Sequence, residues 1–123
     1  ALIADGKWNP ESGAAGVSTL LARGEALSAL VASNDDMAIG AMKQLHDSGI
    51  ATPGKVSVIG FDDVAIASYI IPSLSSVRIP VTEMIKETIS RLIFMLDGGE
   101  FTLQQTFSGE LILRDSVIAG PHV

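Results

Sequence analysis

Short apolar runs alternate with segments of helical periodicity through the first half of the chain, and this alternation most constrains its fold. Apolar residues open the chain, recur over 27–33 and fill 56–61. Between these runs, apolar side chains return at three- and four-residue spacing after Asn9 and after Asp35, as they do in amphipathic helices. The order strand, helix, strand, helix, strand favours right-handed crossovers. The sequence therefore predicts an α/β fold built on a parallel sheet.

Both predicted helices carry start and stop signals. Asn9 is a good N-cap, and Pro10 stands at the first helical position, where its missing N–H costs nothing. Gly24 is expected to end this helix. We expect Asp35 to cap the second helix, which ends near Gly49 in the manner of a left-handed cap.

The second half follows a different pattern. Residues 62–71 are expected to form a loop or a short helix, and 74–80 should be extended because Pro80 disfavours helical geometry before it. A wide apolar face predicts a helix over 81–96, and 106–117 reads as one late strand. The preceding unit has little surface to cover that face, so we expect it to pack on something outside this chain.

Composition excludes several classes of protein. The 123 residues, a single domain by length, carry 8 Lys and Arg against 14 Asp and Glu. With a net charge of −6 the chain has no excess of positive charge to attract phosphates, so we expect that it does not bind nucleic acid by itself. Without cysteine the chain has no disulfide, thiolate metal site or cysteine nucleophile. No apolar run approaches the roughly 20 residues that a membrane span needs, so no membrane partner is expected.

The start of the chain indicates a fragment. It opens at Ala1 rather than Met, inside an apolar run, so we expect a piece of a longer polypeptide. The opening residues lack the basic lead and long apolar core of a signal peptide. Part of the functional machinery is therefore expected to lie outside this chain.

Polar side chains follow each of the three predicted strands. The first loop holds Trp8, the second Asn34 and the third Asp62. The carboxyl ends of parallel strands meet at one edge of a sheet, where such folds bind ligands. An aromatic ring can stack on the CH face of a sugar, while amide and carboxylate oxygens pair with its hydroxyls. These residue types favour a sugar site.

Several of these residues have a structural alternative. Asp35 is expected first as a helix cap, and Asp63 could cap the short segment that follows it. Asn34 could equally serve a turn, and Trp8 could lie at the rim of the core. Asp62 has no such role apparent, so it is the better candidate for a ligand contact.

Sequence signals for catalysis are weak. The Asp doublets at 35–36 and 62–63 could suggest a metal or acid–base site, but no third carboxylate or histidine stands at a diagnostic spacing. His46 suits the end of its helix, and His122 lies in a tail. The nucleophile elbow, the P-loop and the dinucleotide fingerprint are all missing. We therefore expect no enzyme, no metal site and no cofactor.

Five motifs, in order and correctly spaced, resemble the carboxyl-terminal part of LacI/GalR-family transcriptional repressors. They are GKWNPESG (6–13), VASNDDMAIGAM (31–42), VSVIGFDD (56–63), YIIPSLSSVRIP (69–80) and GELILRDSV (109–117). The resemblance covers essentially the whole chain. It implies a Rossmann-like subdomain of the type I periplasmic-binding-protein fold, in which two subdomains hold an effector in the cleft between them.

The resemblance also implies a division of the chain. Residues 1–73 would belong to the carboxyl-terminal effector-binding subdomain. Residues 74–106 would be a crossover and a helix belonging to the amino-terminal subdomain, and 107–123 would be the return strand and tail of the carboxyl-terminal one. This agrees with the expectation that the apolar face of 81–96 is covered from outside the chain.

Residue roles carry over by position. The resemblance implies that Trp8 stacks on the effector and that Asn34 and Asp62 contact it. It further implies that the family's dimer contacts include Ile39 and Tyr69. Ordinary core packing is the alternative for these two residues.

The function implied is the effector-sensing and dimerisation part of a cytoplasmic bacterial repressor, with operator DNA bound only by an amino-terminal head absent from this chain. Within the family, the sequence is most similar to repressors of β-glucoside operons, which implies a sugar or glycoside effector. The alternative is a periplasmic sugar-binding protein of a transport system, which shares the fold and similar motifs. The ending SGELILRDSV and the crossover LSSVRIP (74–80) favour the repressor.

Overall fold

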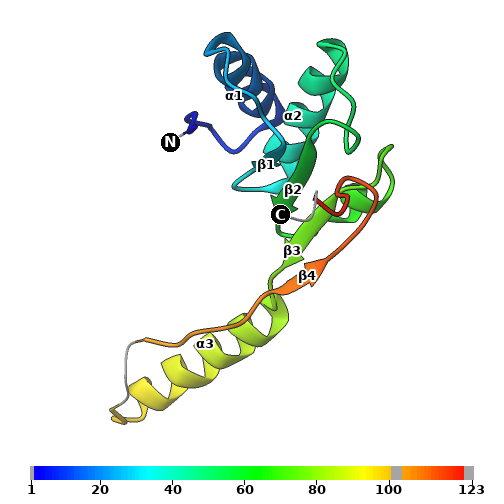
Figure 1. Ribbon diagram of the computed structural model, residues 1–123. Helices are drawn as coiled ribbons and strands as arrows, with labels where there is room; N and C mark the ends of the chain where they lie inside the picture. Colours follow the sequence, from blue (N-terminus) through cyan, green and yellow to red (C-terminus); the bar gives the residue numbers. More distant parts are fainter. Residues whose placement is uncertain (1, 101–103, 121–123) are drawn as a thin grey trace.

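The computed structural model describes residues 2–100 and 104–120, which form a body and a projecting helix (Figure 1). In the body, α1 (Pro10–Ala22) packs against α2 (Asp35–Asp47), and α2 packs on the sheet. The helix α3 (Val81–Leu96) extends away from the body at the far end of the sheet.

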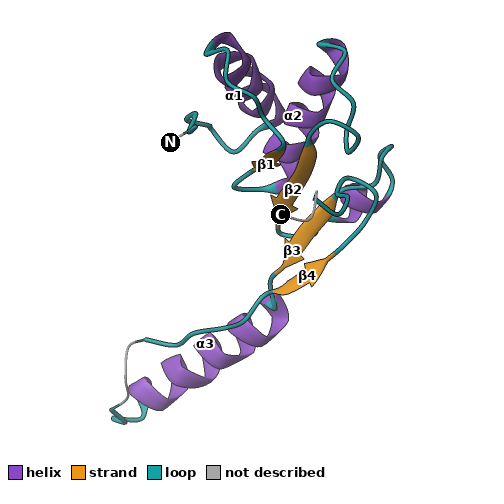
Figure 2. Cartoon of the chain, in the orientation of Figure 1, coloured by secondary structure: helices purple, strands orange, loops and turns teal. Residues whose placement is uncertain are grey.

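Four strands make up the sheet (Figure 2). In spatial order they are β1 (Ala29–Val31), β2 (Ser57–Phe61), β3 (Ser75–Arg78) and β4 (Glu110–Ile112). The first three run parallel, and β4 runs antiparallel to β3. The predicted α/β fold with a parallel sheet is confirmed. A short 3-10 helix, η1 (Ala65–Ser68), separates β2 from β3, as the prediction of a loop or short helix allowed.

Most helix boundaries fall where the sequence places them. The Asn9 side chain accepts the Ser12 N–H at 2.9 Å, and Pro10 is the first helical residue. Two residues after the end of each body helix stands a glycine with left-handed φ, Gly24 at 71° and Gly49 at 72°, a conformation that L side chains disfavour. The bounds of α3 match the predicted helix.

The strand predictions were less accurate. Residues 2–6 form no ladder, the 27–33 strand shrinks to β1, and the late strand covers only the three residues of β4. Val31, expected inside a buried strand, is 81% exposed. The reason is the alternation of side chains along a strand: Leu30 packs against the core, so its neighbour Val31 points to the opposite face of the sheet, where it is exposed. β4 can pair only along the four residues of β3.

The core lies where the two body helices meet the sheet. Its aliphatic side chains include Val17, Leu20, Met42, Leu45, Val56, Val58 and Leu74. Helix α1 comes so close to α2 that the contact leaves no room for a side chain at Gly13 or Gly40. A Cβ on Gly40 would lie 1.8 Å from the carbonyl oxygen of Pro10, and one on Gly13 would lie 2.0 Å from that of Met37.

Helix α3 buries none of its side chains. Its exposed apolar residues include Ile85, Ile89, Leu92, Ile93 and Phe94. The first turns of α3, together with Ile79, line an apolar groove of about 370 Å³ that includes Ile85 and Ile89. Despite this apolar surface, no helix within 2–100 and 104–120 has both the length and the hydropathy to cross a membrane.

Candidate functional site

The loops that follow β1 and β2 leave the sheet at the same edge. The two strands are parallel neighbours, with Val31 opposite Ile59, so the chain exits both in one direction. Asn34 comes shortly after β1, and Asp62 comes directly after β2. The expected convergence of these loops therefore follows from the observed register.

Asn34 joins the loop after β1 to the loop that carries Trp8. Its Oδ1 accepts the Met37 N–H at 2.9 Å, while its Nδ2 donates to the Trp8 carbonyl oxygen at 3.2 Å. Trp8 has a left-handed φ of 61°, and it is 67% exposed. Asn34 thus fixes the backbone of Trp8 while the indole stays outside the core.

Asp62 occupies an unusual backbone conformation with φ 108°. Its N–H donates to the carbonyl oxygen of Val77 at 2.9 Å, and the residue is exposed. Partial desolvation, with the negative charges of Asp35 and Asp36 nearby, raises the pKa of Asp62 above its ordinary value. The charged form is therefore disfavoured in the folded state.

The raised pKa of Asp62 has a definite sign for stability. The unfolded chain releases this proton near pH 3.8, before the folded chain does. Folding stability consequently falls as the pH rises from the unfolded value through the folded one. At neutral pH the charge of Asp62 therefore works against the fold.

Asp35 does not cap α2, contrary to the expectation; Asn34 is the N-cap, and Asp35 is the first helical residue. The Asp35 side chain is fully buried, and it accepts the Ser76 hydroxyl at 2.6 Å and the Val64 N–H at 2.8 Å. Its oxygens therefore serve β3 and the loop after β2, which leaves the cap to its neighbour. Gly60 makes room for it, since a Cβ there would lie 2.1 Å from Asp35 Oδ1.

Asp63 does not cap the following segment either; Val64 precedes η1 and makes no side-chain cap. Instead its Oδ2 accepts Arg78 Nε at 2.7 Å and its Oδ1 accepts Arg114 Nη2 at 2.6 Å. The Asp63 side chain is only 5% exposed. Burial alone would raise the pKa of Asp63, but the hydrogen bonds from Arg114 and Arg78 lower it below its ordinary value.

Sequence reasoning missed this second set of residues. Asp63 and Arg114 are 51 residues apart, and Asp35 and Ser76 are 41 apart, so no local spacing links either pair. The sequence did contain one signal: an Asp doublet follows each of two predicted strands. In such a doublet one carboxylate can make structural contacts while the other stays exposed to a ligand.

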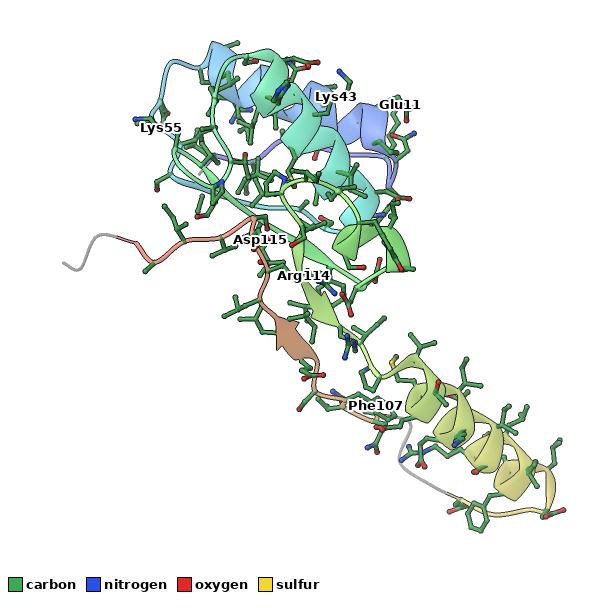
Figure 3. All side chains as sticks on the ribbon, turned by 90° about the vertical axis from the view of Figure 1, so that its right-hand side faces the viewer. Glu11, Lys43, Lys55, Phe107, Arg114 and Asp115 are labelled. Carbon is green, nitrogen blue, oxygen red and sulfur yellow. The ribbon has the colours of Figure 1, made fainter. Side chains whose placement is uncertain are left out.

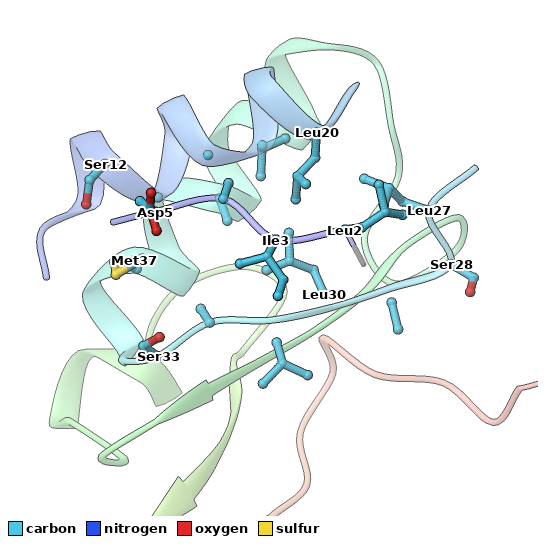
Figure 4. Close-up of a pocket in the computed structure, with 18 of the residues that line it drawn as sticks. Leu2, Ile3, Asp5, Ser12, Leu20, Leu27, Ser28, Leu30, Ser33 and Met37 are labelled. Carbon is cyan, nitrogen blue, oxygen red and sulfur yellow. The ribbon is translucent and has the colours of Figure 1, made fainter. Parts of the chain in front are cut away.

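A cavity of about 500 Å³ lies elsewhere (Figure 4). It is enclosed by residues 2–5, α1 and β1, and side chains such as Ile3, Leu20 and Leu30 line it. None of Trp8, Asn34 and Asp62 lines this cavity. Its largely aliphatic wall does not suit a sugar, so the exposed sheet edge remains the candidate site.

His46 does not contribute to this site. His46 lies exposed at the end of α2, beside Asp47, in the position that its sequence context suggested. His122 lies outside the described residues. Within those residues, no group of three His, Cys, Asp or Glu side chains is placed to hold a metal ion.

The two candidate dimer residues differ in their surroundings. Ile39 is half-buried on α2 and packs against the core, whereas Tyr69 is 79% exposed after η1. Ile71, two residues beyond Tyr69, is 98% exposed. Tyr69 and Ile71 thus form an exposed apolar strip after η1. The alternative of core packing therefore does not hold for Tyr69.

Comparison with known proteins matches residues 3–117 to the family described as periplasmic binding protein-like domain. The HTH-type transcriptional regulator AscG of Escherichia coli (strain K12) is 71% identical over 118 residues, which are 96% of this chain and 35% of AscG. The chain spans about a third of the length of AscG and of the GalR regulator from the same organism.

Two solved structures share the architecture. The lac repressor dimer bound to operator and the anti-inducer ONPF is 28% identical with a TM-score of 0.87, over 93% of this chain and 40% of that one. The transcriptional regulator CelR in complex with cellobiose is 29% identical with a TM-score of 0.85, over 90% of this chain and 34% of that one.

Proposed function

We propose that this chain forms the effector-binding part of a DNA-binding repressor. It belongs to the periplasmic binding protein-like domain family and, within it, to the LacI-family transcriptional regulators. The observation that carries this proposal is the sheet edge that holds Asn34 and Asp62, with Trp8 tied to Asn34. Such a protein regulates rather than catalyses and works in the cytoplasm. Operator DNA would be bound by a head outside this chain, whose own net charge is −6.

The effector we propose is a sugar, and more narrowly a β-glucoside. Trp8 offers an exposed ring for the CH face of a pyranose, and the Asp62 carboxylate and Asn34 amide offer polar partners for its hydroxyls. The CelR relative was solved with cellobiose, a β-linked glucose disaccharide. The raised pKa of Asp62 supports this role, because an uncompensated carboxylate gains most from a hydroxyl donor.

The same proposal assigns the crossover and helix of 74–106 to a second subdomain, which would supply the opposite wall of the binding cleft, although β3 at the start of this range pairs with β2 in the sheet of the body. Helix α3 exposes its whole apolar face, so burial against that subdomain would be strongly favourable. Residues 1–73 and 107–123 would form the other subdomain, whose sheet β3 completes by pairing with β2 and β4. The effector would then bias the angle between the two subdomains by binding one orientation more tightly.

Titration of the parent polypeptide, with both subdomains present, tests the effector. We expect cellobiose, salicin or arbutin to produce a saturable change in the fluorescence of Trp8, the only tryptophan of this chain. Any other tryptophan of the parent is replaced by phenylalanine beforehand. In Asp62→Asn we expect affinity to fall by about 100-fold, because a buried sugar hydroxyl loses its charged acceptor.

Two controls accompany this titration. Asp62→Asn should be at least as stable as the parent at neutral pH, because it removes a charge that opposes folding. Asp5→Asn removes an exposed carboxylate near the aliphatic cavity and should leave affinity unchanged. A folded protein whose fluorescence responds to none of the three sugars would overturn the β-glucoside assignment.

We also propose that this chain contributes to a homodimer through Tyr69 and Ile39. The exposed strip of Tyr69 and Ile71 supports this, since large exposed apolar side chains mark protein interfaces. We expect Tyr69→Ala to weaken dimerisation by about tenfold or more, as removal of a central interface aromatic does. Sedimentation equilibrium at several concentrations measures the effect.

Thr19→Ala serves as the matched control for dimerisation, because Thr19 is exposed on α1, outside this strip. Its dimerisation constant should equal that of the parent. A monomer at high concentration before any substitution would contradict the proposed dimer.

A further inference from the structure

The loop that presents Asp62 is held by three successive backbone contacts. The N–H of Asp62 donates to the Val77 carbonyl oxygen, and the N–H of Asp63 donates to Ser76 Oγ at 3.0 Å. The N–H of Val64 donates to the buried carboxylate of Asp35 at 2.8 Å. These bonds anchor the loop to β3 and α2, but none of them constrains the Asp63 side chain.

The Asp63 side chain adds a separate connection. It receives Arg78, the last residue of β3, and Arg114, which follows β4 by two residues. Arg114 is mostly buried and also donates to the Leu74 carbonyl oxygen at 2.7 Å. One carboxylate thereby contacts the end of β3 and the segment that directly follows β4.

Figure 3 shows Arg114 at the junction between the body and these two strands. Its backbone is also fixed there, since the Arg114 N–H donates to Ser75 Oγ at 2.8 Å. Arg114 is thus fixed by contacts to Ser75 and Leu74 in addition to its ion pair with Asp63. Because Asp63 and Arg114 are both mostly buried, this ion pair is held more firmly than a pair of exposed side chains, which contributes little.

We propose that Asp63 is a positioning residue, whose carboxylate, held by Arg78 and Arg114, fixes the loop that presents Asp62 and ties it to the β3–β4 pair. Asp62 and Asp63 both have positive φ, 108° and 54°, which L residues rarely adopt without such support. The inference rests on the proposed role of Asp62 in effector binding. It adds a route by which a ligand at Asp62 is coupled to the strands that carry α3.

Arg114→Gln in the parent polypeptide tests this inference through the pKa of Asp62, measured by NMR titration of its carboxyl carbon. Loss of the guanidinium charge alone can only raise that pKa, because a nearby cation favours the carboxylate. If the loop relaxes away from Asp35 and Asp36, the pKa of Asp62 falls toward its ordinary value. We expect the pKa of Asp62 to fall, because the movement of the loop should change it more than the loss of the Arg114 charge does.

Cellobiose affinity provides the second readout. We expect Arg114→Gln and Asp63→Asn each to weaken binding by about tenfold, although neither side chain is free to contact the sugar. Glu110→Gln is the control: Glu110 reaches Arg78 at 3.4 Å but does not touch Asp63, so both readouts should keep their parent values.

The outcomes separate this inference from the proposed function. A pKa of Asp62 that stays constant or rises in Arg114→Gln overturns the positioning role. If the parent binds none of the sugars, the effector assignment fails, and the pKa of Asp62 still decides the role of Asp63. Should Arg114→Gln fail to fold, Arg78→Gln replaces it, because Arg78 is half-exposed and its loss spares the core.

Discussion

Gly40→Ala is expected to lower the free energy of unfolding by about 3 kcal/mol, the upper end for overpacking of a tight core. The added Cβ would lie 1.8 Å from the oxygen and 2.5 Å from the carbon of the Pro10 carbonyl. These are backbone atoms at the start of α1, so no side chain can swing aside and the whole helix must shift. The gain of about 1 kcal/mol in helix propensity is too small to offset this.

Urea denaturation of the parent polypeptide, followed by circular dichroism, measures this effect. Gly16→Ala is a matched control, because Gly16 lies within α1 and its added Cβ would come no closer than 3.6 Å to another atom, on Ala4. This control should be neutral or more stable by up to about 1 kcal/mol. Equal midpoints for the two variants would show that the α1–α2 contact tolerates a side chain at Gly40.

Asp35→Ala is expected to cost about 3 kcal/mol of folding free energy. The substitution leaves the Ser76 hydroxyl and the Val64 N–H without their shared acceptor, and each such group costs about 1–3 kcal/mol when buried. It also opens a space beside Gly60, which the side chain now fills. Thermal and urea denaturation should both report the loss.

Two further variants test whether the buried hydrogen bonds of Asp35 cause this loss of stability. Asp35→Asn keeps one acceptor oxygen and should lose less stability than Asp35→Ala. Asp36→Ala, at the exposed neighbouring position, should change stability by no more than about 0.5 kcal/mol. If Asp35→Ala matched Asp36→Ala, the buried contacts of Asp35 would be dispensable for the fold.

The helices were predictable because their signals are local. The Asn9 cap, Pro10 and the terminal glycines act within one turn of the helix they bound, so a single sequence contains the whole argument. The strands depend on neighbours instead. β1 pairs only with β2, and Val31 lies on the face of the sheet opposite the core; no residue within 27–33 encodes either fact.

The candidate site divides in the same way. The places of Asn34 and Asp62 follow from parallel strand order, so periodicity and loop position predicted them together. Asp35 and Asp63 were each assigned a capping role because such a role needs only the adjacent helix. Their actual partners, Ser76 and Arg114, come from strands far along the chain, and only the folded sheet brings them close.

The β3–β4 ladder limits how α3 can move. Both links between the body and α3 run through these two strands, which are hydrogen-bonded in a fixed antiparallel register with Val77 opposite Leu111. Sliding one strand along the other by a single residue would turn its side chains to the opposite face and break the ladder. The pair must therefore bend or twist as one ribbon, which leaves α3 free to rotate relative to the body but not to translate along the strands.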